Sequence, residues 1–515
     1  MTTTPIIAGF YPDPSICRAG DTYYLANSSF EYLPGVPIHQ STDLTTWTPV
    51  TNALQRPDQL NLDLAPPSTG VYAPTLRYHD GKFWLVTTNV VEFHRGQLIV
   101  SADDPAGPWS PAVHVEGAVG IDPDLAWDET GTCHLTWASA LPDRHGIASA
   151  PLDLETGTLL SPPRLLWPGT GLAYPEGPHL YRRDGWWYLM LAEGGTERGH
   201  VVTIARSPSL DEPFEAAPAN PVLTHRSTGH PVQNTGHADL VELADGSWAM
   251  VYLGVRPRGQ TPMFHTNGRE TFIAGVEWID GWPVVDEERF EAAPQDHSFV
   301  DRFETADLDD RWISPNRHPG TFARHEAAGR LVLTAPSDHA PRPMLVARAR
   351  DLEWTAEARL DTSAGTGRFL VRVDRDHWYG LTASAEHVEA SVVIGPATTT
   401  LARVTVPSGQ GVTLRISARE PEVTPPIPRH EPDIIELSVV APDGTSQVLG
   451  TVDGRYLSTE VAGGFTGRTF GVEPVAGSIS VQEISYRPHP PAAGRSGALT
   501  PDAGQGTENT GGFQP

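Results

Sequence analysis

Short apolar segments, each followed by a turn and a second apolar or aromatic segment, recur five times in the first 297 residues. Short runs bounded by Gly and Asp are typical of β-strands, and the periodicity of amphipathic helices is nearly absent. The five copies are DPSICRAGDTYYLAN from Asp13, APTLRYHDGKFWLVTT from Ala73, DPDLAWDETGTCHLTW from Asp122, EGPHLYRRDGWWYLML from Glu176 and HADLVELADGSWAMVYL from His237.

The copies begin about 50 to 60 residues apart, which leaves room for about four strands in each. Four strands per repeat make the blade of a β-propeller, so residues 1–297 are predicted to form a five-bladed propeller. The first strand of each blade lines the central channel, so the residues that open the copies point at one spot. Asp13, Asp122, Glu176 and His237 are among them. Because buried carboxyls are costly unless they have a task, this convergence predicts an active site.

The pattern changes near residue 297. Alternating runs such as GRLVLTA, FLVRVDRDHWYGLTAS and HVEASVVIG predict an antiparallel β-sandwich over residues 298–487. A proline-rich loop from Pro421 to Asp433 interrupts it. Residues 488–515 are rich in Pro, Ala, Gly, Ser and Thr and are predicted to be a disordered tail. The whole chain is therefore expected to be all-β.

Composition narrows the class of partner. The net charge of −27 argues against nucleic acid and acidic membrane surfaces, and it suits a neutral substrate. The two cysteines, Cys17 and Cys133, imply no disulfide framework. The opening MTTTPIIAGFYPDPS has no signal-peptide pattern, and no apolar run approaches the length of about 20 residues that spans a bilayer. A cytoplasmic protein is the expectation.

Several short motifs, in their order and spacing, resemble glycoside hydrolase family 43 on its β-xylosidase and α-L-arabinofuranosidase side. The motifs are FYPDPSI, NSSFEYLPGVPIHQSTDL, GVYAPTLRYHDGKFWL, GIDPDLAWD, YPEGPHLY, TGHADLV, and GRETF followed by VEWIDGWPVV. The resemblance covers roughly residues 5 to 485. It implies a five-bladed propeller that carries the catalytic site, followed by a concanavalin-like (jelly-roll) sandwich that completes the pocket.

The resemblance also implies catalytic roles. Asp13 in YPDPSI matches the general base, Glu176 in YPEGPHLY the general acid, and Asp122 in GIDPDL a carboxylate that orients the acid and raises its pKa. These roles agree with the chemistry of inversion, which needs a base and an acid about 6.5–9.5 Å apart with water between them. Asp124 is a less favoured alternative to Asp122, because two steps along a strand lead deeper into the channel.

Five substrate-binding residues carry over from the resemblance. One is His237 at the channel mouth, which some relatives use without metal to hold the active-site carboxyls. Arg269 in GRETF matches the arginine that contacts the sugar, and it would also keep Asp13 ionised. Phe30 matches an aromatic wall of the pocket. Tyr72 stands in GVYAPT where many xylosidases of the family have Trp, which leaves the preferred pentose open. Phe465 in GGFTG matches a sandwich loop that reaches over the pocket as a lid.

Metal binding is not demanded by the sequence. No cofactor is expected to be required, although some relatives bind Ca²⁺ through water near the histidine that His237 matches. Calcium prefers several oxygen ligands, so one histidine is a poor predictor of it. His225, His230 and His237 lack convincing zinc spacing.

The expected activity is exo-acting, inverting hydrolysis that removes terminal xylose from the non-reducing end of xylo-oligosaccharides, with arabinofuranosidase side activity. An α-L-arabinofuranosidase acting on arabinoxylan or arabinan fragments is the alternative within the class. A non-catalytic carbohydrate-binding propeller is a remote alternative, and the intact carboxyls count against it. Relatives with this pair of domains are often dimers or tetramers, so a homo-oligomer is a further expectation.

Overall fold

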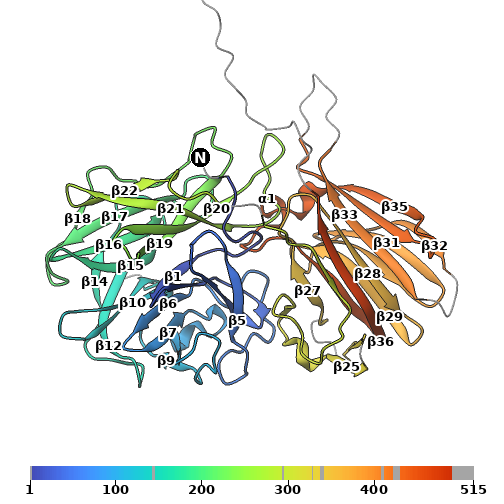
Figure 1. Cartoon of the computed structure of the whole chain (residues 1–515), viewed down its shortest axis with the longest axis horizontal. Coiled ribbons are helices and arrows are strands. Elements are labelled where there is room, and N and C mark those ends of the chain that lie inside the picture. The colour runs from blue at the N-terminus through green and yellow to red at the C-terminus, as the bar shows by residue number, and fades with distance from the viewer. Residues whose placement is uncertain are drawn as a thin grey trace, which may run out of the picture.

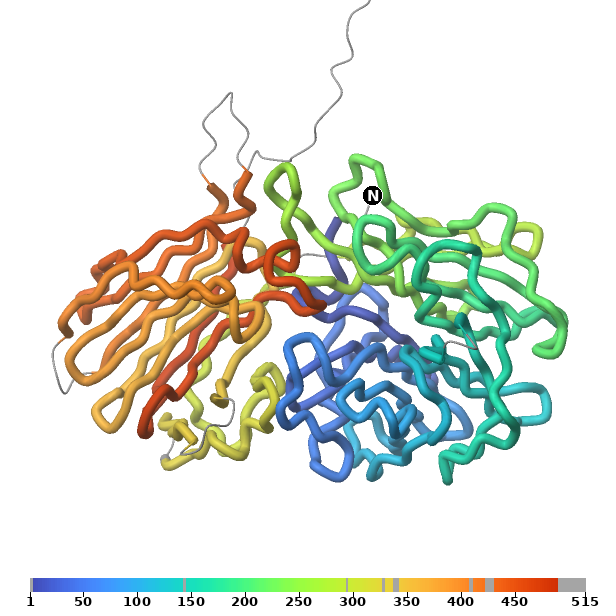
Figure 2. Tube along the Cα trace, turned by 180° about the vertical axis from the view of Figure 1, so that it is seen from behind, coloured from blue at the N-terminus to red at the C-terminus, as the bar shows by residue number. Residues whose placement is uncertain are grey.

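Two β-structures lie side by side, the first built from the N-terminal part of the chain and the second from the C-terminal part (Figure 1). The computed structural model describes residues 3–489 apart from 142–144, 293–294, 328, 337–341, 407–410 and 422–429. The view from behind shows the same two bodies meeting along one side of each (Figure 2). Most of the Pro421–Asp433 loop and nearly all of the predicted tail lie outside the described residues.

Five antiparallel sheets follow one another in the first body, and each starts with its innermost strand. The first strands β1, β6, β10, β15 and β19 contact one another in a closed ring. The strands of blades one and two are β1 (Ser15–Ala19), β2 (Thr22–Ala26), β4 (Gly35–Ser41), β5 (Thr48–Leu54), β6 (Thr75–His79), β7 (Lys82–Thr87), β8 (Gln97–Ala102) and β9 (Val113–Val115).

The third, fourth and fifth blades repeat the arrangement. Their strands are β10 (Gly120–Trp127), β11 (Cys133–Ser139), β12 (Gly146–Asp153), β13 (Thr158–Leu159), β14 (Arg164–Trp167), β15 (Glu176–Arg183), β16 (Trp186–Glu193), β17 (Val201–Ser207), β18 (Glu215–Ala216), β19 (Gln233–Glu242), β20 (Trp248–Val255), β21 (Glu270–Ile279) and β22 (Trp282–Asp286). The five-bladed propeller is confirmed.

The ring is closed by residues that precede the first blade. Ile7 pairs with Thr271 on β21 of the last blade, and the Ile6 amide donates to the Thr271 carbonyl at 2.9 Å. Both isoleucines are fully buried. The segment just before Asp13 is therefore fixed to blade five, which sets the position of Asp13 at the channel mouth.

One long strand joins the two layers of the second body. β36 pairs with β27 and β29 along its first half and with β23, β26 and β28 along its second half. The strands are β23 (Phe299–Asp301), β25 (Ala323–Ala327), β26 (Arg330–Thr334), β27 (Leu345–Arg348), β28 (Trp354–Asp361), β29 (Gly365–Arg372), β30 (His377–Ala383), β31 (His387–Ile394), β32 (Ala397–Thr405), β33 (Val412–Arg419), β34 (Ile434–Val440), β35 (Ser446–Asp453) and β36 (Thr469–Pro488). The predicted sandwich is confirmed.

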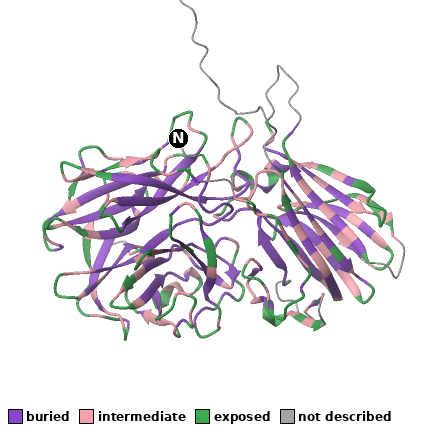
Figure 3. Ribbon diagram, in the orientation of Figure 1, coloured by how far each residue is buried: buried purple, intermediate pink, exposed green. Residues whose placement is uncertain are grey.

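The core of the sandwich is apolar. Phe470 and Tyr486 stack on each other there, Trp354 packs against both at a tilt, and alternate residues of each strand join them. Figure 3 shows buried and less buried positions alternating along these strands, whereas β19, the inner strand of blade five, is buried almost continuously. The helical turns among the described residues are η1 (Val90–Arg95), η3 (Pro319–Thr321), η4 (Gly454–Leu457) and α1 (Thr459–Ala462). In the described part of the chain, no helix is long and apolar enough to cross a membrane.

The two bodies share a strand pair and an apolar cluster. β3 (Tyr32–Leu33) from the propeller pairs with β24 (Ser314–Pro315) from the sandwich side. The buried cluster around this pair is Phe10, Phe30, Tyr32, Ile313, Met344 and Val346, with Tyr72 and Phe465 packed against it. This junction holds the loop that carries Phe465 over the mouth of the propeller channel.

Candidate active site

A cavity of about 390 Å³ lies at the mouth of the propeller channel, next to the sandwich. All eight residues predicted to form the site line it, namely Asp13, Phe30, Tyr72, Asp122, Glu176, His237, Arg269 and Phe465. Ala73, which opens the second repeat, lines it as well. The equivalent positions of the five repeats therefore meet at one cavity, as the repeat pattern predicted.

Unusual backbone conformations direct these side chains into the cavity. Asp13, Asp122 and His237 have φ values of 54°, 56° and 46°, in the left-handed region that few non-glycine residues adopt. The pairing of β10, β15 and β19 with the next strand shifts register at Asp122, Glu176 and His237. Such β-bulges turn a side chain away from its regular direction and are common beside active sites.

Asp13 is held as an ionised carboxylate. It is 5% exposed, accepts a 2.8 Å hydrogen bond from Arg269 Nη1 at Oδ1, and accepts a 2.5 Å bond from Ser28 Oγ at Oδ2. His237 Nδ1 lies 3.7 Å from Asp13 Oδ1. Burial alone would raise the pKa of Asp13, but Arg269 and the Ser28 hydroxyl outweigh it and hold the pKa below its usual value.

The pKa of Glu176 is shifted in the opposite direction. Burial, together with the negative charge of Asp13, raises the pKa of Glu176 to about 7, against the opposing effect of Arg269. The glutamate is therefore largely protonated in the mildly acidic range, in the same cavity as an ionised aspartate. Two carboxyls with pKa values pushed apart are the arrangement that acid–base catalysis requires.

Asp122 contacts the backbone beside the glutamate. Its Oδ2 accepts a 3.1 Å hydrogen bond from the Gly177 amide, which fixes the peptide that follows Glu176. Burial and the charges of Glu176 and Asp13 raise the pKa of Asp122 well above its usual value. This contact places Asp122 beside the acid, but the charge that raises the pKa of Glu176 comes from Asp13, and the orienting role of Asp122 stays a prediction. A direct influence of Asp122 on that pKa stays a prediction.

Three aromatic rings form one wall of the cavity. Phe30 stacks on Phe465 with 6.0 Å between centroids, and Tyr72 meets both rings edge-on at 5.9 and 5.8 Å. The guanidinium of Arg269 lies over Phe30 and Phe465, at 5.8 and 5.4 Å from their centroids. Phe465 comes from the sandwich, and its amide donates to Ser68 Oγ of the propeller at 2.8 Å. The sandwich therefore supplies part of the cavity wall.

Below the cavity, an arginine fills the channel. Arg77 donates to Asp124 Oδ1 and Asp239 Oδ2, both at 2.7 Å, and both aspartates are fully buried. Asp124 also accepts from the Leu180 amide, and Asp239 from Tyr181, Ser15 and the Ile16 amide. Asp124 is thus a structural partner of Arg77, which agrees with the preference for Asp122 in the site.

These contacts bear on calcium in the channel. The oxygens of Asp124 and Asp239 already accept hydrogen bonds, so they fit poorly as ligands of an ion that prefers six to eight oxygens. Burial lowers the pKa of His237 to about 4, so its ring is neutral near neutral pH. Water-mediated binding of Ca²⁺ near His237 stays a prediction.

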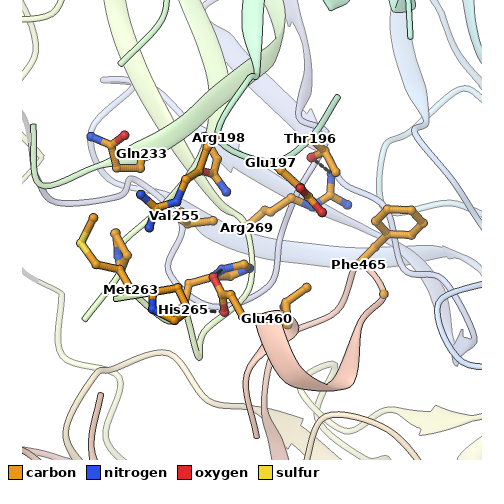
Figure 4. A pocket seen from close by; sticks show the side chains of 15 residues that line it. Thr196, Glu197, Arg198, Gln233, Val255, Met263, His265, Arg269, Glu460 and Phe465 are labelled. Carbon is orange, nitrogen blue, oxygen red and sulfur yellow. Dashed lines mark hydrogen bonds and ion pairs between the residues drawn. The ribbon is translucent and has the colours of Figure 1, made fainter. Parts of the chain in front are cut away.

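A second cavity, of about 510 Å³, adjoins the first (Figure 4). The two cavities share Thr196, Glu197, Arg269 and Phe465 as lining residues. The second one lies at the junction of the two bodies, where His265 Nδ1 is 2.7 Å from Glu460 Oε1. Arg269 Nη1 also donates to Thr196 Oγ1 at 3.0 Å.

Sequence reasoning missed Ser28, Ser68, Thr196 and Glu197. Ser28 lies in the NSSFEY motif beside Phe30, so the motif pointed to the right segment without distinguishing the hydroxyl from the ring. The other three lie outside the motifs that were assigned roles, and only the fold brings them to Arg269 and Phe465.

Both halves of the chain match known sequence families. The profile of glycosyl hydrolases family 43 matches residues 2–283. The chain belongs to this family. The profile of the β-xylosidase C-terminal concanavalin A-like domain matches residues 300–476. The two matched regions cover most of the propeller and most of the sandwich, in that order.

The alignments with related proteins cover different shares of the chain. A non-reducing end α-L-arabinofuranosidase of Bacteroides ovatus is 36% identical over 501 residues, which cover 91% of this chain and 90% of that protein. A xylosidase/arabinosidase of Butyrivibrio fibrisolvens is 42% identical over 349 residues, which cover 62% of this chain and 66% of that protein. The match therefore spans slightly less than two thirds of the Butyrivibrio protein.

Solved structures show the same pair of domains. The protein named xyloglucan PUL GH43B, from Bacteroides ovatus, matches with a TM-score of 0.84 at 32% identity, over 94% of this chain and 99% of that one. A xylan β-1,4-xylosidase of Bacillus halodurans matches with a TM-score of 0.83 at 28% identity, over 95% of this chain and 100% of that one. Family 43 enzymes with both domains thus share the arrangement of this chain.

Proposed function

We propose that the protein removes terminal xylose from the non-reducing end of xylo-oligosaccharides by inverting hydrolysis, with arabinofuranosidase side activity. The observation that carries the proposal is the pairing, in one cavity, of an ionised Asp13 with a Glu176 whose pKa is raised to about 7. Asp13 acts as the general base toward water, and Glu176 protonates the leaving oxygen.

The placement of the two carboxyls supports inversion. Asp13 precedes the first strand of blade one, and Glu176 opens the first strand of blade four. Blades one and four are not neighbours in the ring of five, so the two carboxyls approach the channel mouth from different sides, as a mechanism with a sugar and a water molecule between them requires. Arg269 holds Asp13 ionised and lines the cavity, so its guanidinium can also donate to sugar hydroxyls.

The size and the aromatic lining of the cavity support exo-action. A volume of about 390 Å³ and a wall of three aromatic rings suit one pentose bound at a chain end. Xylosidases recur among the names of the relatives, as in the Bacillus halodurans structure and the Butyrivibrio protein. The substrate is therefore a small oligosaccharide.

A second candidate function is α-L-arabinofuranosidase activity on arabinoxylan or arabinan fragments. Tyr72 favours it, because tyrosine has a hydroxyl and a narrower ring than the tryptophan of many xylosidases of the family, which changes the wall of the sugar subsite. The Bacteroides relative that aligns with 91% of this chain bears the name of an arabinofuranosidase.

Initial rates on nitrophenyl β-D-xylopyranoside and nitrophenyl α-L-arabinofuranoside test the two candidates. The proposal expects a preference for the xyloside, and a lower rate on it in Glu176→Ala than in the wild type. A preference for the arabinofuranoside would select the second candidate, and no release of nitrophenol from either would contradict both.

The stereochemistry has its own test. Proton NMR during the first minutes of xylobiose hydrolysis reports which anomer of xylose forms first. Inversion of a β-xyloside gives α-xylose before mutarotation, whereas first-formed β-xylose would show retention and would contradict the assignment of Asp13 as a base.

A further inference from the structure

Two histidines and a glutamate meet at blade five, and none of them lines the catalytic cavity. His225 and His230 lie between β18 and β19, and Glu287 directly follows β22. One ligand atom from each side chain lies within 4.8 Å of those of the other two. Within the described residues, this is the only group of three or more histidine, cysteine or acidic side chains placed closely enough to hold a metal ion.

The hydrogen bonds of His225 leave a lone pair directed at a carboxylate. Its Nδ1 lies 2.8 Å from the carbonyl oxygen of Val232, which only accepts, so Nδ1 carries the proton. Its Nε2 lies 2.8 Å from Glu287 Oε1, which is also an acceptor when ionised. A cation, either a proton or a metal ion, must therefore stand between these two atoms.

His230 adds a second imidazole at the same place. Its ring centroid lies 3.8 Å from that of His225, and its Nδ1 lies 3.0 Å from the same Val232 carbonyl. The Val232 amide is also within 3.1 Å of this Nδ1, so the tautomer decides which contact forms. In the tautomer that donates to the carbonyl, Nε2 is free to bind an ion. Histidine ligands of metals usually donate their other ring N–H to a carbonyl or carboxylate in this way.

We propose that His225, His230 and Glu287 bind one zinc-class divalent ion through the two Nε2 atoms and a carboxylate oxygen. Two imidazoles and a carboxylate suit Zn²⁺, Co²⁺ or Ni²⁺, whereas Mg²⁺ and Ca²⁺ prefer oxygen ligands. Tetrahedral ligands of zinc lie about 3.3 Å apart, so the His225–Glu287 contact opens by about half an ångström on binding. Tyr252, whose hydroxyl is 3.2 Å from Glu287 Oε1, orients the carboxylate.

The ion would join the two ends of blade five. The histidines lie just before β19, its innermost strand, and Glu287 lies just after β22, its outermost. Gln233, the first residue of β19, donates to the His230 carbonyl at 2.7 Å and lines the second cavity. Because the unfolded chain has no preformed site, bound metal stabilises the folded state.

Metal binding by the full chain tests the proposal. Protein stripped with EDTA is titrated with Zn²⁺ by calorimetry, and with Co²⁺ while its visible absorption is recorded. We expect one ion per chain, Co²⁺ bands typical of low coordination number, and a higher Tm with Zn²⁺. Glu287→Gln and His230→Gln should each weaken Zn²⁺ binding at least about tenfold.

A matched control separates this site from other histidines. His134 Nε2 pairs with Asp128 Oδ2 at 3.0 Å in blade three but belongs to no such group of three, so His134→Gln should bind Zn²⁺ like the wild type. Circular dichroism and hydrolysis of the nitrophenyl glycoside check that the variants fold. The absence of a one-equivalent site would overturn the proposal and leave His225 paired through a proton. Equal Zn²⁺ affinity in wild type and Glu287→Gln would also overturn it, as adventitious binding only.

Discussion

The mouth of the propeller channel and the layer below it, formed by Arg77, Asp124 and Asp239, both contain carboxylates and an arginine. The two layers differ in how the carboxylate charges are balanced. At the mouth, Asp13, Asp122 and Glu176 share one cation, Arg269, and two of the three carboxyls have raised pKa values. In the lower layer, Arg77 contacts two aspartates, whose remaining oxygens accept further hydrogen bonds.

The ratio of carboxyls to cations accounts for the difference. One arginine can neutralise Asp13, so the next carboxyls in the same low-dielectric space hold protons instead. In the lower layer, Arg77 and several donors lower the pKa of Asp239, which makes it a fixed anion rather than a proton carrier. The carboxyls that lack a cation can therefore carry protons, whereas those paired with an arginine, Asp13 and Asp239, stay ionised.

Replacement of the acid should give the largest effect. Glu176→Ala should lower kcat/KM on xylobiose about 10²–10⁴-fold, because the leaving oxygen loses its proton donor. The loss should be smaller on nitrophenyl glycosides, whose leaving group needs less protonation. Steady-state kinetics on both substrates measures the contrast, and equal losses on the two would contradict the acid role.

The pH profile tests the same residue. Glu176 works protonated, so wild-type activity should fall as pH rises through about 7. Asp13 works ionised and has a lowered pKa, so activity should be lost on the acid side only below the usual range of an aspartate. The alkaline decline should disappear from the residual activity of Glu176→Ala, and its persistence would assign that limb to another group.

The structural arginine should matter for stability. Arg77→Met leaves two buried aspartates without their cation and should lower the free energy of unfolding by about 3–5 kcal/mol. Urea denaturation measures it. Arg269→Met is the matched change at the mouth, and it should cost more activity and less stability. If both variants lost equal stability, the contrast between the two layers would be wrong.

Two neighbouring aspartates on β10 sharpen the comparison. Asp124→Asn should lower the free energy of unfolding by about 1–3 kcal/mol, because Arg77 loses a paired negative charge and one of the two accepting oxygens becomes a donor. Asp122→Asn should lower kcat and leave the melting temperature nearly unchanged. Thermal melts and kinetics on the two variants check both halves, and reversed effects would return Asp124 to the catalytic site.

Truncation of Phe465, in the aromatic wall of the cavity, should give the smallest effect. Phe465→Ala should raise KM for xylobiose up to about tenfold and admit water to the cavity. Better solvation lowers the pKa of Glu176, so the alkaline decline should move to lower pH. Rates on xylobiose and on longer oligomers measure the role of the Phe465 ring in selecting chain ends. Unchanged ratios and an unchanged pH profile would rule out a lid function.

Several features could be predicted from the sequence because local chemistry repeats. Five copies of one strand–turn–strand pattern defined the blades, and AspGly turns such as Asp80–Gly81 adopt the positive φ values that tight hairpins need. Equivalent positions in a ring of repeats must converge, so Asp13, Asp122 and Glu176 could be placed together without coordinates. Arg269 and Phe465 were found through motifs that matched a family, not through the repeat.

Tertiary structure alone decided which carboxyls carry protons. The sequence contains Asp122 and Asp124 two positions apart on one strand, and nothing local distinguishes their protonation. Arg77 lies 47 residues from Asp124 and 162 from Asp239, so its selection of partners depends on the closed ring. Likewise, His225 and His230 lacked convincing zinc spacing because Glu287, 62 residues from His225, completes the group. Repetition determined where the site lies, and burial with charge pairing determined what each residue there can do.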